Sequence, residues 1–192
     1  SILKILFKTK LYFHEQNSVI GRVHRIFLFT TNKIFLTFEN TKGIKSKYIN
    51  KVNLVGLPLN KNIKKFSKRK FSILGNKDKI QILIFGGSQG SSKLSILIVN
   101  LITQLSLDVQ KLIFLTIQTP IQNHKELKSK LNKTKAEYEI KQFYEDIYKK
   151  MSNSSFCICR SGASTINELV KLCVPSILVP LPYSTDNHQY YN

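Results

Sequence analysis

Apolar and polar residues alternate along residues 79–192 in a pattern that predicts strands and helices in turn. Residues 79–85 are short, almost continuously apolar and followed by two glycines, which is typical of a buried strand in a parallel sheet. Residues 93–105, by contrast, carry apolar side chains at helical spacing. The same reasoning predicts strands at 111–117, 138–143, 156–159 and 176–181 and helices at 122–132, 146–151 and 163–172. This alternation predicts an α/β fold whose parallel sheet is covered by helices through right-handed crossovers.

The first part of the chain reads as a different, incomplete unit. Here the pattern predicts strands at 10–13, 33–38 and 51–55 and an amphipathic helix at 19–29. The stretch that follows contains Pro58 and the densest run of basic residues, which favours a linker. We therefore expect a first domain over 1–56, a linker over 57–78 and a second domain over 79–192. Because the sequence starts with Ser1 inside this pattern, we expect it to be a piece of a longer protein.

The composition is that of a soluble, core-forming protein with a large excess of positive charge. The hydrophobic fraction is 42%, the mean hydropathy is −0.12 and the formal net charge is +19. Residues 1–80 alone carry 18 basic and three acidic side chains. Such a field favours an anionic partner: nucleic acid, anionic lipid or a phosphorylated substrate. The abundance of Lys together with Asn, Ile, Phe and Tyr is equally what an AT-rich genome would produce, so charge alone selects none of these.

Three cysteines without framework spacing indicate a reducing compartment. Cys157 and Cys159 lie two apart in an apolar strand, so we expect both on one buried face. No further ligands lie near them in the sequence, and no metal site is predicted. No apolar run reaches the roughly 18 residues of a membrane span. Residues 1–13 are apolar but hold three lysines and lack a small-residue cleavage site, so they resemble neither a span nor a signal peptide.

Two loops between a predicted strand and a predicted helix are candidates for binding phosphate. The first, GGSQG at 86–90, would let the backbone approach a phosphate closely. The second, RSGAST at 160–165, leads into a helix that carries Glu168 one turn further on, where it could accept ribose hydroxyls. Each also has a plainer interpretation. The glycines could serve only to turn the chain, and Ser161 or Ser164 could simply cap the helix beside a solvated Glu168.

Two polar clusters follow other predicted strands. Residues 186–192 (DNHQYYN) suit sugar hydroxyls but also suit an ordinary loop. Residues 14–17 (HEQN) come directly after the first apolar run, where a histidine is more often structural than catalytic. In open α/β sheets ligands bind outside the carboxyl ends of the strands, which is where all four loops are expected.

In this order and at these intervals, the segments HEQNSVIG, GGSQG, CRSGASTINEL and PSILVPLP followed by HQYYN resemble the MurG family of peptidoglycan glycosyltransferases. The resemblance runs from residue 10 to 192 and is weaker at 30–50 and 60–78. It implies a GT-B fold, in which two Rossmann-like domains face each other across a cleft. Residues 1–56 would be the tail of the acceptor domain and 79–192 most of the UDP-sugar-binding domain.

The resemblance also implies a reaction and its partners. The family is inverting and transfers N-acetylglucosamine from UDP-N-acetylglucosamine to undecaprenyl-pyrophosphoryl-N-acetylmuramoyl-pentapeptide, forming lipid II for peptidoglycan. It implies a peripheral location at the cytoplasmic face of the bacterial inner membrane, no cofactor, no metal and no nucleic-acid partner. An association with the membrane surface is also suggested by the apolar and basic residues of segment 1–13.

The site residues follow position by position from the same resemblance. Asn17 would reach in from the acceptor side, the backbone of Tyr144 would read the uracil edge, and His14 is a possible catalytic base. The remaining implied donor contacts are Gly87, Ser88 and Gln89 in the glycine loop, Ala163, Ser164 and Thr165 at the diphosphate, Glu168 at the ribose, and Gln189 at the sugar hydroxyls.

The chain departs from the family pattern in two respects. An Arg that helps neutralise the diphosphate is replaced by Asn60 in the sequence VGLPLN, and Asn60 carries no charge. The N-terminal glycine-rich loop and the C-terminal closing helix of the family are not in this sequence. We therefore expect the isolated chain to be inactive. Two alternatives stay open, a non-catalytic nucleotide-sugar-binding remnant and a basic nucleic-acid-binding protein, although no motif of the latter kind is present.

Overall fold

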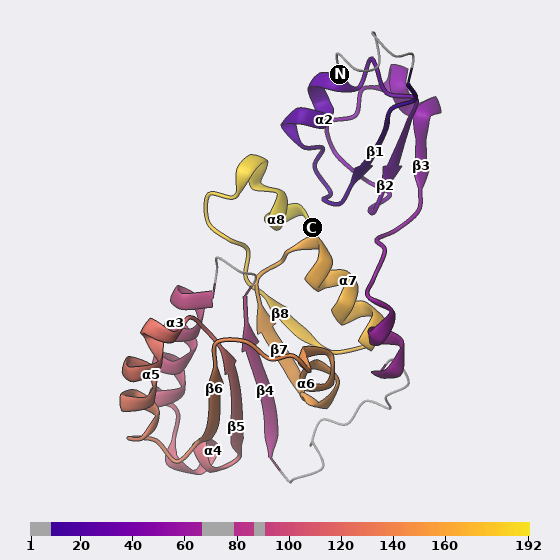
Figure 1. Ribbon diagram of the computed structural model, residues 1–192. Helices are drawn as coiled ribbons and strands as arrows, with labels where there is room; N and C mark the ends of the chain where they lie inside the picture. The colour runs from indigo at the N-terminus through magenta and orange to yellow at the C-terminus, as the bar shows by residue number, and fades with distance from the viewer. Residues whose placement is uncertain (1–8, 67–78, 87–90) are drawn as a thin grey trace. The chain divides into compact units, whose positions relative to one another are not determined.

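The computed structural model describes residues 9–66, 79–86 and 91–192. The chain divides into two compact units. The first comprises residues 1–59, 161–167 and 180–192, and the second comprises residues 60–160 and 168–179. Among the described residues, one three-stranded and one five-stranded sheet are formed, and every strand pair in them is parallel (Figure 1).

The first unit holds the three-stranded sheet in the order β1-β2-β3. Its elements are β1 (Tyr12–Glu15), α2 (Arg22–Phe27), β2 (Lys33–Leu36), η1 (Ser46–Lys51) and β3 (Val52–Leu54), with η4 (Thr185–Asn187) and α8 (His188–Tyr191) from the C-terminal segment. A small core of Ile20, Leu28, Ile34 and Leu36 joins the flanks of α2 to the central strand. This core buries few side chains, so much of α2 faces solvent: none of its own residues is buried.

The second unit holds the five-stranded sheet in the order β6-β5-β4-β7-β8. Its strands are β4 (Ile80–Phe85), β5 (Ile113–Gln118), β6 (Glu137–Lys141), β7 (Phe156–Cys159) and β8 (Ser176–Leu178). The helical elements are η2 (Lys61–Phe66), α3 (Ser91–Gln104), α4 (Leu107–Lys111), η3 (Ile121–Asn123), α5 (His124–Leu131), α6 (Ile147–Asn153) and the later part of α7 (Ala163–Leu172).

Helices α3 and α5 lie side by side on one face of this sheet (Figure 1). Their buried apolar side chains meet alternate strand residues. The cluster contains Ile82, Ile84, Leu94, Val99, Ile102, Ile113, Leu115, Ile117, Leu127, Leu131, Ala136 and Ile158. Because side chains alternate along a strand, Leu83 points to the opposite face and is also fully buried. A strand buried on both faces reads as a continuous apolar run, which explains the pattern of β4.

Each predicted strand and each predicted helix is present, and the differences concern boundaries. Strand β1 runs on through Glu15, so His14 and Glu15 belong to the strand and do not follow it. Strand β8 ends at Leu178, because Pro180 and Pro182 lack the N–H that a longer ladder needs. The short helix α4 was not predicted, although Ser106 caps it by accepting a hydrogen bond from the N–H of Val109.

Cys157 and Cys159 are fully buried on β7, as predicted. Burial raises the pKa of the Cys159 thiol to about 12, so the thiol stays protonated and unreactive at neutral pH. Neither cysteine is in a disulfide. Within the described segments, no helix is long and apolar enough to cross a bilayer.

The strand order places a topological switch point in the second unit. From β4 the chain moves outward to β5 and β6, then returns to form β7 on the other side of β4. The ends of the two strands are in register, with Phe85 paired to Cys159. A crevice at such a reversal, outside the carboxyl ends of the strands, is where open α/β sheets bind ligands.

Candidate functional site

The beginning of helix α7 supplies free backbone donors close to the end of β7. Only residues 160–162 separate the two elements, and the backbone N–H of Ile166 donates to the carbonyl of Gly162 as the helix starts. The N–H groups of Ala163, Ser164 and Thr165 precede that bond and so have no intrahelical acceptor. Together with the helix dipole they form an arrangement that suits an anion, in particular a diphosphate.

Glu168 lies one turn further along α7 and is half-buried. Its Oε1 accepts a hydrogen bond from the hydroxyl of Tyr148 at 3.1 Å. Burial raises the pKa of the Glu168 carboxyl above its ordinary value, while this hydrogen bond acts in the opposite direction. The plainer interpretation, in which Glu168 is a solvated carboxylate, is therefore wrong: Glu168 is half-buried and accepts from one identified donor.

Ser161 does not cap helix α7, and the side chain of Gln189 is not free. Both take part in hydrogen bonds between the end of β7 and the C-terminal segment. The hydroxyl of Ser161 donates to the backbone carbonyl of Gln189 at 2.5 Å, and the N–H of Leu181 donates to the Gln189 side-chain oxygen at 2.9 Å. These bonds close the loop between β8 and α8. The side-chain NH₂ of Gln189 remains the group that could donate to a sugar hydroxyl.

Asn17 belongs to a polar network in the first unit whose centre is Asn192. The Asn192 side-chain oxygen accepts from both the backbone N–H and the hydroxyl of Ser18, at 2.9 and 3.1 Å. The Asn192 side-chain NH₂ donates to the Asn17 side-chain oxygen at 3.2 Å and to the carbonyl of Ser161 at 3.1 Å. Sequence reasoning placed Asn192 in a polar cluster without giving it a role. Its position as the last residue of the sequence offered no further signal.

The Glu15 side chain is almost fully buried and holds the turn that carries Asn17 through hydrogen bonds. Glu15 accepts hydrogen bonds from the N–H of Gly21 at 2.7 Å, from the N–H of Asn17 at 3.0 Å and from Nδ1 of His24 at 2.8 Å. Burial alone would raise the pKa of Glu15, but these bonds outweigh it and hold the pKa below its ordinary value.

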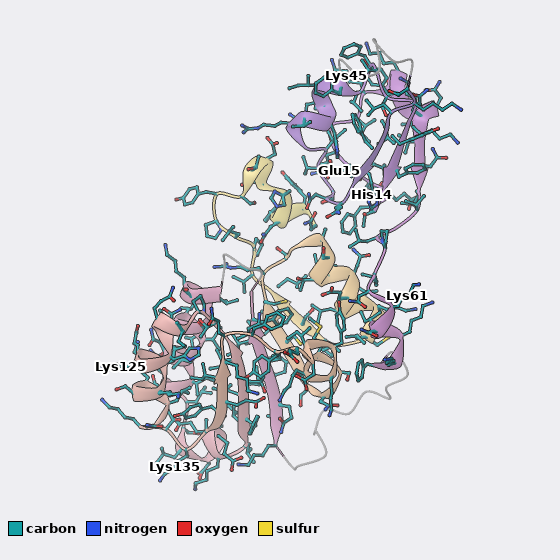
Figure 2. All side chains as sticks on the ribbon, viewed as in Figure 1. His14, Glu15, Lys45, Lys61, Lys125 and Lys135 are labelled. Atoms are coloured by element: carbon teal, nitrogen blue, oxygen red, sulfur yellow. The ribbon has the colours of Figure 1, made fainter. Side chains whose placement is uncertain are left out.

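His14 precedes Glu15 on β1, and Figure 2 labels both side chains. Its Nε2 lies 3.0 Å from the carbonyl oxygen of Gly56 and 3.4 Å from the hydroxyl of Thr37. A carbonyl can only accept, so Nε2 carries the proton and Nδ1 is the basic nitrogen of the neutral ring. Gly56 has φ +74°, a conformation that glycine adopts readily and that turns the chain at this point.

Tyr144 follows β6 and is fully buried. Its hydroxyl donates to the carbonyl of Glu139 at 3.5 Å, and its ring lies beneath the ammonium groups of Lys141 and Lys150. Burial, followed by the charges of Glu139 and Asp146, raises the pKa of Tyr144 well above its ordinary value. The side chain thus anchors the loop after β6, which leaves only the backbone of this position for a ligand contact.

Asn60, the residue that the resemblance aligns with the missing Arg, directly precedes helix η2. Its side-chain oxygen accepts from the N–H of Asn62 at 2.9 Å and its carbonyl accepts from the N–H of Ile63 at 3.1 Å. Gly87, Ser88 and Gln89 lie outside the described residues. In the segments that the structure describes, no group of three or more His, Cys, Asp or Glu side chains could hold a metal ion.

A hollow of about 280 Å³ lies beside the Asn17–Ser18 turn in the first unit. It is lined by Ser18, Phe38, Glu39, Asn40, Lys42 and Tyr191. The Lys42 ammonium stands 3.5 Å from the centre of the Tyr191 ring, a cation–π contact. This volume falls below the usual range of ligand pockets, so the hollow by itself is too small for a nucleotide sugar.

Comparisons with known proteins agree with the sequence resemblance. The family model "Glycosyltransferase family 28 C-terminal domain" matches residues 81–192, which is more than half of the chain. A curated relative from Rickettsia bellii (strain RML369-C) is 34% identical over 98% of this chain and 53% of its own length. One from Aquifex aeolicus (strain VF5) is 35% identical over 98% of this chain and 52% of its own length. Both are named UDP-N-acetylglucosamine--N-acetylmuramyl-(pentapeptide) pyrophosphoryl-undecaprenol N-acetylglucosamine transferase.

A solved structure shares the fold. The crystal structure of Acinetobacter baumannii MurG matches with a TM-score of 0.74 and 24% identity, over 99% of this chain and 51% of that one. This chain accordingly spans about half the length of the curated relatives that it matches. The likeness supports the predicted GT-B type of α/β fold.

Proposed function

This chain belongs to the glycosyltransferase family 28 C-terminal domain family, and from that membership we propose that it binds UDP-N-acetylglucosamine as the donor of a sugar-transfer reaction. The acceptor that we propose is undecaprenyl-pyrophosphoryl-N-acetylmuramoyl-pentapeptide, and the product is lipid II. The names of the relatives from Rickettsia bellii and Aquifex aeolicus support this choice of donor and acceptor.

The observation that carries the proposal is the start of α7 at the switch-point end of β7. Three N–H groups without helical acceptors come first, at Ala163, Ser164 and Thr165, and a desolvated carboxylate follows at Glu168. Backbone donors at a helix start suit a diphosphate, and a carboxylate one turn on suits the hydroxyls of a ribose. A nucleoside diphosphate has both groups in this order.

The other proposed donor contacts come from segments before and after α7 in the sequence. Gln189 would donate its side-chain NH₂ to the sugar, and the backbone of Tyr144 would read the uracil edge. Asn17 would contact the sugar from the acceptor side. Gly87, Ser88 and Gln89 would complete the contacts to the donor from the glycine loop.

The proposed reaction inverts the anomeric carbon. The C4 hydroxyl of the muramoyl sugar attacks that carbon, the bond to the diphosphate breaks, and the leaving UDP takes the electron pair. The donors at the start of α7 stabilise the charge that develops on the leaving group. A base removes the proton of the attacking hydroxyl, and His14 would do so through Nδ1, because Nε2 is engaged with Gly56. No step requires a metal ion or a cofactor.

We further place the protein at the membrane surface, where the lipid-linked acceptor resides. Helix α2 and its C-terminal flank expose Val23, Ile26 and Phe29, each about two-thirds accessible. Val23 and Ile26 are three apart in α2 and so share a face, and Phe29 follows in the turn after the helix. We call these three residues the apolar stripe. Arg22 and Arg25 flank the stripe, and the whole chain carries a formal charge of +19. An apolar stripe beside basic groups suits the surface of an anionic bilayer.

Calorimetry of UDP binding tests the donor site. We expect Glu168→Ala to weaken UDP by about 1.5–3 kcal/mol, the contribution of hydrogen bonds to a charged acceptor. The exposed Glu145, in the same unit, gives a matched control, and Glu145→Ala should leave UDP affinity unchanged. Equal affinity of the parent chain for UDP and 2′,3′-dideoxy-UDP would show that Glu168 does not hold the ribose.

A further inference from the structure

Glu168 has a hydrogen-bond partner that is not among the proposed donor contacts. Tyr148 lies on α6, and its hydroxyl donates to Oε1 of Glu168 on α7 at 3.1 Å. Both side chains are half-buried. In the described part of the chain this is the one hydrogen bond that the Glu168 carboxylate accepts, and Oε2 has no partner there.

The hydrogen bond from Tyr148 occupies one oxygen of the Glu168 carboxylate and leaves the other for a ligand. An ionised carboxylate offers about four acceptor positions, so a bond at Oε1 leaves Oε2 available. A glutamate side chain has several rotatable bonds, and holding it in one rotamer before a ligand arrives removes an entropic cost of binding. The phenol therefore both orients the carboxylate and keeps one oxygen turned away from it.

Protonation favours the same arrangement. Burial raises the pKa of Glu168, which works against the ionised acceptor, and the phenol counteracts that rise. Burial and the neighbouring carboxylate in turn raise the pKa of Tyr148, so its hydroxyl remains a donor at neutral pH. Tyr148 is thus a neutral hydroxyl that donates to the Glu168 carboxyl group.

We propose that Tyr148 is a positioning residue for ribose recognition: its hydroxyl holds the Glu168 carboxylate so that Oε2 accepts a ribose hydroxyl of the nucleoside diphosphate. The inference rests on the proposed donor site and deepens it. If the Tyr148–Glu168 hydrogen bond served only to join α6 to α7, its loss would lower the stability of the fold. It would not change how the chain distinguishes one nucleotide from another. Recognition of the ribose is therefore the property to measure.

The measured quantity is the ratio of the dissociation constants of 2′,3′-dideoxy-UDP and UDP. In Tyr148→Phe the ratio should fall about tenfold, the equivalent of roughly one hydrogen bond to a charged group, while affinity for the dideoxy nucleotide stays at the parent value. Tyr138→Phe is the matched control, since Tyr138 also donates its hydroxyl within the same unit, to Asn132, and it should leave the ratio unchanged.

A double variant tests whether the tyrosine acts through the carboxylate. In a Glu168→Ala background, Tyr148→Phe should produce no further change in the ratio. Tyr148→Leu, which removes the ring as well, should lower the ratio as much as Tyr148→Phe and serves if the phenylalanine variant does not fold. A ratio that stays at the parent value in both variants, or parallel weakening of both nucleotides, would overturn the inference and leave the donor site standing. A parent ratio of one would overturn the ribose role of Glu168 itself, and the inference with it.

Discussion

At the scale of single residues, two glutamates differ in their hydrogen-bond partners, and their pKa values shift in opposite directions. Glu15 is saturated by backbone N–H groups and His24, and its pKa lies below the ordinary value. Glu168 receives one phenol, and burial keeps its pKa above the ordinary value. A saturated carboxylate holds a loop in place, whereas a desolvated carboxylate with acceptor capacity to spare suits a ligand.

The saturation of Glu15 predicts how stability depends on pH. Glu15→Gln puts an NH₂ group against donors that need an acceptor, so the first unit should lose about 1–3 kcal/mol at neutral pH. The pKa of Glu15 is lowered in the fold, so its contribution is complete above the ordinary value of 4.5 and is lost as the pH falls through the lower folded pKa. The difference between parent and variant should therefore shrink in acid.

Hydrogen exchange of the β2 amides across a pH series measures this difference in the first unit. The exposed Glu39 provides the control, and Glu39→Gln should follow the parent at every pH. A destabilisation by Glu15→Gln of the same size at neutral and strongly acidic pH would contradict the assigned role of the carboxylate.

At the scale of elements, the alternation of apolar and polar residues was sufficient wherever a strand or helix buries a regular face. Strand β7 and helix α7 have the predicted limits. Periodicity did not predict element boundaries that depend on the presence or absence of single hydrogen bonds. The Ser106 cap creates a five-residue α4 that is too short to show a period, and the prolines after β8 end the ladder early.

The C-terminal end of helix α2 is stabilised by a contact that no sequence pattern predicts. The ammonium group of Lys51 donates to the carbonyls of Leu28, Phe29 and Thr31, at 3.4, 3.4 and 2.8 Å. Leu28 is the C-cap of α2, and Phe29 and Thr31 follow it, so these carbonyls lie past the last turn of the helix. A cation at this end also complements the helix dipole. Lys51 lies at least twenty positions from each partner along the chain, so only the fold brings them together.

We expect Lys51→Met to destabilise the first unit by about 1.5–3 kcal/mol, because the variant keeps most of the aliphatic stem but removes the charged donor. Faster hydrogen exchange of the amides in β2, with unchanged exchange in β5 of the second unit, would be the result. Lys47→Met is the control, since Lys47 contacts only the face of the Tyr48 ring among the interactions described for it. Equal effects of the two variants would show that the helix end does not depend on Lys51.

At the scale of the whole molecule, the candidate site was predicted mainly from the order of short motifs along the chain and less from the chemistry of any single loop. Backbone donors at a helix start and a nearby glutamate are common, and only their order with HEQN, GGSQG and HQYYN made a nucleotide-sugar site the preferred hypothesis. The bonds of Asn192 to Asn17, Ser18 and Ser161 join segments far apart in the sequence. No spacing rule predicts such contacts, because they depend on how the chain folds back.

Charge and exposed apolar surface act together at this scale and predict binding to anionic vesicles. Each Lys or Arg near an anionic surface contributes about 1 kcal/mol, and the contribution is screened by salt. We expect the chain to float with vesicles containing phosphatidylglycerol, to float less at high salt, and to remain unbound with purely zwitterionic vesicles. Serine substitutions of the three stripe residues, Val23, Ile26 and Phe29, should abolish most of the flotation by removing the apolar contact.

The matched control replaces three equally exposed apolar residues of the second unit, Ile121, Phe143 and Val170, with serine. Both triple variants remove a similar amount of exposed apolar surface, and neither alters the net charge. If general hydrophobicity caused the binding, the two variants would lose flotation to the same extent. If charge alone caused it, both would float like the parent. Loss confined to the Val23, Ile26 and Phe29 variant would identify helix α2 as the membrane contact, because only there does the apolar stripe lie beside Arg22 and Arg25. Flotation of the parent that is indifferent to both anionic lipid and salt would contradict membrane association through this surface.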